Sequence, residues 1–165
     1  MLNMDISKLS EIGKVTFCIM IAERAANYLQ YKIIIEDVLK KCREWVGIKR
    51  KYDNGESVGF DFSAYCEDLA DDLYNALDNE DNGFGILQEE EEDEQKINAW
   101  DCVIYSVGYV SKSAYLSAGA KYFPEPIELA DENTVTLSAE SLLKCSDEEL
   151  ESIRKIYDYC LNEKV

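Results

Sequence analysis

The chain has 165 residues, of which 34 are acidic and 17 basic, and it contains no histidine, so its net charge is -17. Nucleic acids and anionic membranes bind clusters of lysine and arginine, so this charge argues against direct binding to either. It favours a basic protein partner or a divalent cation. Histidine is the usual general base near neutral pH and the commonest zinc ligand. Because histidine is absent, we predict that the protein is not an enzyme and that it binds no cofactor.

Hydrophobic residues make up 47% of the sequence, which is enough to form the core of a single domain over residues 1–165. The first residues do not resemble a signal peptide, and the most apolar run, 15–22, is too short to span a bilayer. We therefore expect a cytoplasmic protein. Six cysteines without a Cys-x-x-Cys pair favour reduced, buried thiols.

Apolar residues recur at three- and four-residue steps in four long segments, which is the period of an amphipathic helix. The four segments are 6–29, 32–48, 63–77 and 95–118. The segment 95–118 is expected to be the central helix because its apolar face is broad. Gly108 and Ala114 are small enough to let another helix approach it closely, and Gly119 suits the residue after its end.

The last third of the sequence predicts shorter elements. Two prolines make 123–127 extended or irregular. A short helix is expected at 138–144. Ser146, followed three residues later by Glu149, matches a capping box and predicts the start of a last helix. Together these patterns predict an all-α bundle of five to six helices.

The stretch from 53 to 95 holds sixteen acidic residues and no basic one. Four of the carboxylates share the outer face of the helix expected at 63–77, where no lysine at i,i+4 offsets their repulsion. Such a face is either a solvated surface or part of a docking surface. The acidic run 89–94 is expected to be the solvated start of the next helix. The candidate partner-binding residues are Glu67, Asp68, Asp71, Asp72, Tyr74, Asp78, Glu80 and Asp81.

Residues 78–89 match part of the calcium-binding loop of an EF-hand, with aspartate at position 1, glycine at position 6 and glutamate at position 12. Two positions depart from the template: Glu80 is longer than the usual residue at position 3, and Gly85 replaces an aliphatic residue. The candidate ligands are Asp78, Glu80, Asn82 and Glu89. A calcium-responsive binding protein is therefore one alternative function. An acidic nucleic-acid mimic, with carboxylates spaced like phosphates, is another.

The helix expected at 95–118 carries the motif 97–100, Ile-Asn-Ala-Trp, followed by Tyr105, Tyr109 and the pair 114–115, Ala-Tyr; a Phe-Pro pair at 123–124 comes after it. Together with the chain length and the acidic middle, these features resemble a bacterial immunity-protein family, number six in the polymorphic-toxin classification. The resemblance covers about residues 60–130. It implies a cytoplasmic antitoxin that neutralises a toxin delivered by neighbouring cells, as in contact-dependent inhibition, by occlusion and without catalytic residues. We therefore predict a protein that blocks a basic toxin domain through its acidic surface.

Overall fold

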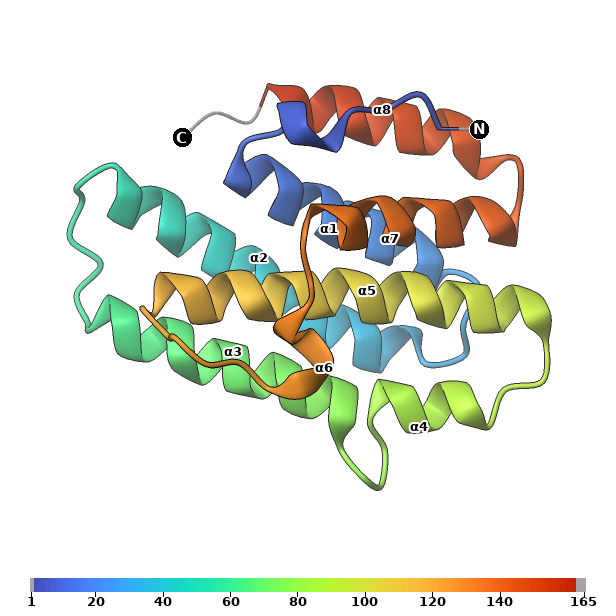
Figure 1. Ribbon diagram of the computed structural model, residues 1–165, viewed down its shortest axis with the longest axis horizontal. Helices are drawn as coiled ribbons and strands as arrows, with labels where there is room; N and C mark the ends of the chain where they lie inside the picture. The colour runs from blue at the N-terminus through green and yellow to red at the C-terminus, as the bar shows by residue number, and fades with distance from the viewer. Residues whose placement is uncertain (1, 163–165) are drawn as a thin grey trace.

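The computed structural model describes residues 2–162 (Figure 1). This part of the chain contains eight α-helices, one short 3-10 helix and no strand, so the prediction of an all-α fold is confirmed. The elements are η1 (Ile6–Lys8), α1 (Glu11–Ala26), α2 (Lys32–Asp53), α3 (Phe62–Asp78), α4 (Phe84–Glu89), α5 (Glu94–Ser117), α6 (Glu125–Glu128), α7 (Glu132–Cys145) and α8 (Glu149–Leu161).

The expected number of five to six helices is too low because two short helices give no readable period. α4 has six residues and is anchored by the buried ring of Phe84. α6 has four residues, and Pro126 lies in its first turn, where the missing N–H of proline is tolerated. The segment 123–127 is therefore not extended throughout. The buried side chain of Ile127 holds α6 against the core.

α5 is the central helix, as the sequence predicts. It runs through the middle of the molecule and packs most extensively against α7, α1 and α3 (Figure 1). Two of its serines are also buried and hydrogen-bonded: the Ser111 hydroxyl donates to the carbonyl oxygen of Ala70 at 3.0 Å, and the Ser113 hydroxyl donates to Glu11 at 2.9 Å. Gly119, after the end of α5, has φ +83°, as a residue closing a helix requires. None of the helices formed within residues 2–162 is long and apolar enough to cross a membrane.

Capping residues decide the helix starts that periodicity places wrongly. The predicted helix 6–29 is divided because the Ser10 hydroxyl accepts the backbone N–H of Gly13 at 3.0 Å and starts α1 at Glu11. α2 continues to Asp53, beyond the expected end at residue 48. α7 begins six residues before the expected 138–144 because Asp131 and Thr134 form a capping box.

The capping box predicted at the start of the last helix is absent. The Ser146 hydroxyl accepts the N–H of Glu148 at 3.2 Å, but the Glu149 side chain does not return to Ser146 and is buried instead. Its carboxylate accepts hydrogen bonds from the guanidinium of Arg24 on α1 and from the Tyr28 hydroxyl at 3.3 Å. A buried carboxylate requires such partners, because losing its hydration is costly. Glu149 therefore ties α8 to α1.

The acidic run 89–94 is not the start of α5. Glu89 ends α4, and the Asp93 carboxylate caps α5 by accepting the N–H groups of Gln95 at 2.9 Å and Lys96 at 3.3 Å. Residues 90–93 therefore connect the two helices. Because Asp93 caps α5, the helix begins at Glu94, and only this last residue of the acidic run belongs to it.

The six cysteines are free thiols, and all are buried, as the sequence predicts. They lie on the inner faces of the helices, within one continuous cluster of buried apolar side chains. Burial raises the pKa of the Cys42 and Cys102 thiols from 9.0 to about 12. Both thiols therefore stay protonated in the folded protein well above neutral pH.

Alkaline pH is expected to weaken the fold through these two thiols. Their pKa is higher in the folded state than in the unfolded state, so the folded protein holds more protons above pH 9 and its stability falls as the pH rises towards 12. We expect each thiol to lower the free energy of unfolding by about 1–2 kcal/mol between pH 8 and pH 10. Urea unfolding at several pH values measures this loss. In the double variant Cys42→Ala/Cys102→Ala, which removes both thiols, the loss is expected to be smaller by twice that amount, about 2–4 kcal/mol. An unchanged loss would contradict the assignment.

Candidate partner-binding surface

The acidic face expected on the third helix lies on the outer side of α3. Asp61 starts this helix by accepting the N–H of Ala64 at 3.1 Å. The buried side chains recur on one side of the helix and face α2 and α5. Because the four candidate carboxylates occupy the positions between them, they are exposed along two turns. These residues are Glu67, Asp68, Asp71 and Asp72.

The four carboxylates do not have equal surroundings. Asp71 accepts a hydrogen bond from the hydroxyl of Tyr115, whose pKa is raised by burial and by this carboxylate. Asp72 lies 3.9 Å from the ammonium of Lys41 on α2, a partner that the sequence of α3 alone does not reveal. An exposed pair of this kind contributes little to stability, about 0–1 kcal/mol. For Glu67 and Asp68, residues 2–162 provide no hydrogen bond or ion pair.

The other four candidate residues come together at the end of α3. They line an open hollow of about 360 Å³ together with Asn75 and Asn79. These four residues are Tyr74, Asp78, Glu80 and Asp81, and we call the depression the acidic hollow. The Tyr74 hydroxyl donates to the Asp78 carboxylate at 2.9 Å, which raises the pKa of Tyr74. Tyr74 is therefore held at the edge of the hollow and does not extend freely into solvent.

The loop below the acidic hollow has a defined shape. The Asn79 side-chain oxygen accepts the N–H groups of Asp81 at 2.8 Å and Asn82 at 3.2 Å. The chain then passes so close to itself that a Cβ at Gly83 would lie 2.5 Å from the Asn79 nitrogen. Only glycine fits there without a shift of the backbone. The carboxylates of the hollow are thus presented by a helix end and a tight turn.

The same loop gives no support to the calcium hypothesis. An EF-hand presents its ligands from a twelve-residue loop. Here α4 already begins at Phe84, and only residues 79–83 separate it from α3. Nowhere in residues 2–162 are three or more acidic or cysteine side chains grouped so that they could hold a metal ion. Calcium binding by Asp78, Glu80, Asn82 and Glu89 stays a prediction without structural support.

A second depression adjoins the acidic hollow at Asp78. It has a volume of about 410 Å³ and is mostly apolar. Its lining comes from the end of α3, from α4, from the middle of α5, from the segment that contains α6 and from the first turn of α7. Its lining includes Leu77, Ile104, Gly108, Ile127 and Leu129; we call this depression the apolar groove. Sequence reasoning missed it because these residues are up to 52 positions apart.

Residues 64–145 match the family model described as Immunity protein Imm6. The chain belongs to the Imm6 family of immunity proteins. The resemblance noted from the motif at 97–100 and the tyrosines after it is confirmed. The comparison with curated proteins and the comparison with solved structures each found no match.

The segment that matches Imm6 extends from the first turn of α3 to the last residue of α7. All eight candidate residues lie inside it, as do the residues that line the apolar groove. The acidic hollow and the apolar groove are therefore built by the Imm6 part of the chain, whereas η1, α1, α2 and α8 lie outside the match.

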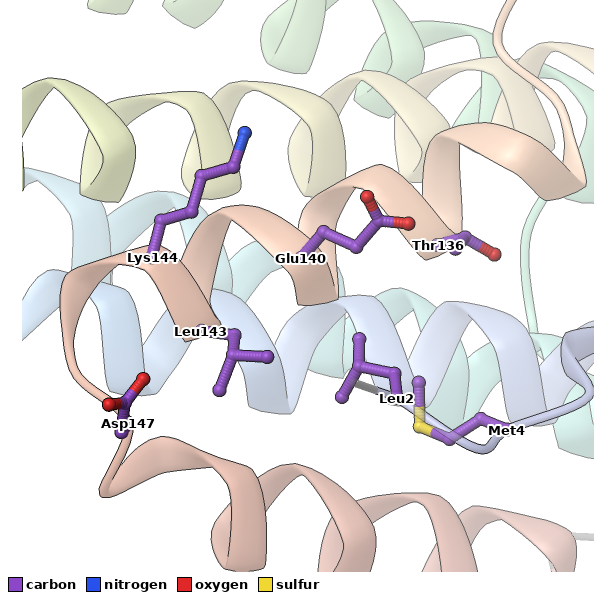
Figure 2. A pocket seen from close by; sticks show the side chains of 7 residues that line it. All are labelled: Leu2, Met4, Thr136, Glu140, Leu143, Lys144 and Asp147. Atoms are coloured by element: carbon purple, nitrogen blue, oxygen red, sulfur yellow. The ribbon is translucent and has the colours of Figure 1, made fainter.

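A third and larger hollow, of about 550 Å³, lies only partly in the Imm6 segment. Figure 2 shows Leu2 and Met4 from the N-terminal segment next to Leu143 of α7, with Glu140 on the neighbouring turn. The Lys144 ammonium points away from these apolar side chains (Figure 2). Its lining therefore combines an apolar floor with separate charged groups on the rim. α7, which supplies most of this lining, lies on the side of α5 away from α3 (Figure 1).

Proposed function

We propose that this chain neutralises a cognate toxin domain by binding it through the acidic face of α3 and the acidic hollow. One observation carries the proposal: in a member of the Imm6 family, the exposed carboxylates are held on a rigid helix and a tight turn inside the family segment. Ordered charges of one sign suit specific binding better than a mobile acidic tail does, because less conformational freedom is lost on binding.

The partner is a basic protein surface. Sixteen acidic residues between positions 53 and 95 produce a focused negative potential that speeds the encounter with a cationic domain. The chain neutralises the toxin by covering it, so the chain itself catalyses no reaction. It acts as a single domain in the cytoplasm. An acidic nucleic-acid mimic is the alternative; it would compete with DNA or RNA for the binding site of its partner.

The test begins with the reading frame next to this gene, where we expect a large secreted protein with a variable C-terminal domain. We expect that domain to be toxic when produced alone and harmless when produced together with this chain. The purified pair should form a complex whose association rate falls by at least about tenfold from low to physiological salt. An association rate independent of salt would overturn the electrostatic mechanism, and a toxin that remains active in the presence of this chain would overturn the function.

A further inference from the structure

The apolar groove is an open depression of about 410 Å³ with a mostly apolar lining. Ile127 and Leu77 both lie over Gly108 of α5: a Cβ placed on Gly108 would lie 3.7 Å from the Ile127 side chain and 3.8 Å from the Leu77 side chain. No side chain of α5 therefore enters the space at this position. The sequence suggests that Gly108 lets another helix approach α5 closely; Ile127 of α6 and Leu77 of α3 pack over it, and the apolar groove lies beside them.

One wall of the groove ends in an exposed leucine. The side chain of Leu129 is 86% exposed, although it lies in the lining of an apolar depression. Its segment is fastened, because the Lys112 ammonium donates hydrogen bonds to the carbonyl oxygens of Glu128 and Ala130, the residues on either side. The backbone contacts of Lys112 thus hold Leu129 in an exposed position at the edge of the apolar groove.

The charges around the groove indicate what kind of chain could occupy it. Asp78 lines both the apolar groove and the acidic hollow, so the two depressions form one continuous surface. Neither lining contains a lysine or an arginine. A second copy of this chain is a poor occupant, because two molecules with a net charge of -17 repel each other. A basic segment with one apolar side chain is complementary to both depressions, because its charge suits the acidic hollow and its apolar side chain suits the apolar groove.

We propose that the apolar groove and the acidic hollow together bind one basic segment of the toxin domain. That segment inserts a leucine-sized or aromatic side chain beside Leu129 and Ile127, and an adjacent lysine or arginine contacts the carboxylates of the hollow. The inference rests on the proposed function and extends it by naming the apolar anchor of the interface. Buried apolar anchors of this kind dominate the dissociation rates of protein complexes, whereas peripheral charges mainly affect association.

The test uses Leu129→Ala and Leu129→Arg with the C-terminal toxin domain encoded by the neighbouring reading frame. Because Leu129 is exposed, both variants should keep the circular dichroism spectrum and the melting temperature of the wild type. We expect Leu129→Ala to raise the dissociation rate at least about tenfold with little change in association, and Leu129→Arg to weaken binding further through repulsion of the basic segment.

The matched control is Tyr159→Ala, which removes a 56% exposed side chain from α8, an element that does not line the groove. Its binding kinetics should equal those of the wild type. If the wild type binds and Leu129→Ala dissociates at the same rate as Tyr159→Ala, the groove is not part of the interface and the inference is overturned, while the proposed function stands. If the wild type forms no complex with the toxin domain, both are overturned.

Discussion

Replacing Glu67 and Asp68 with lysine is expected to slow association with the toxin domain by about 10- to 100-fold at low salt. Both carboxylates are exposed on α3, and the double variant changes the charge of this face by four units. The dissociation rate should change much less, because rim charges act mainly on the encounter. Stopped-flow measurement at several salt concentrations gives both rates, and the difference from the wild type should shrink as salt increases.

These two residues make a cleaner test than their neighbours. Asp71 binds the Tyr115 hydroxyl and Asp72 lies near Lys41, so reversing either would also disturb contacts of α3 with α5 or α2. A loss of binding could then reflect a shifted helix. For Glu67 and Asp68 the contacts within residues 2–162 give no such complication.

The matched control is Glu151→Lys/Asp158→Lys, which makes the same change in net charge on α8. Figure 1 shows α8 at the opposite edge of the molecule from α3. If the whole-molecule charge alone governs association, this control will slow it as much as the α3 variant does. That result would contradict a localised acidic surface.

Replacing Trp100 with alanine is expected to lower the free energy of unfolding by about 3–5 kcal/mol. The indole is fully buried on α5, with ring centroids 5.9 Å from Tyr31 and 5.3 Å from Phe84. It therefore joins α5 to the start of α2 and to α4. Removal leaves a cavity that three separate elements would have to move to fill. Urea unfolding followed by circular dichroism measures the change.

Two variants control for this result. Trp100→Phe keeps most of the buried apolar area and should cost clearly less than alanine. Tyr122→Ala removes an aromatic ring that is 90% exposed and should change the free energy of unfolding by no more than about 0.5 kcal/mol. If Trp100→Ala were as mild as Tyr122→Ala, the packing account of α5 would be wrong.

The spacing of apolar residues was sufficient to predict the helices that bury one face and expose the other. α3 is an example: the spacing of Leu69 and Leu73 places the carboxylates between them on the outside whatever α3 packs against. Helix starts were harder, because one hydrogen bond decides them. Ser10 divides the first predicted helix, and Glu149 was assigned to a cap although it binds Arg24 from another helix.

The acidic hollow and the apolar groove also differ in how far they could be predicted from the sequence. The residues of the acidic hollow are close in sequence, since a helix end and a tight turn bring Tyr74, Asp78 and Asp81 together through local hydrogen bonds. The apolar groove depends on Leu77, Ile104 and Leu129, which meet only when α3, α5 and the α6 segment pack together. No local pattern marks Leu129 as exposed. As a large apolar residue directly after a short helix, Leu129 would be expected in the core.

Composition and the helical period are sufficient to predict the all-α class, the central position of α5, the buried thiols and the acidic outer face of α3. The family assignment also came from residues along the chain. No local pattern predicts that Lys41 lies near Asp72, that Glu149 is buried against Arg24, or that an apolar groove lies beside Asp78. These contacts join side chains from separate helices, and their formation depends on the packing of the whole core.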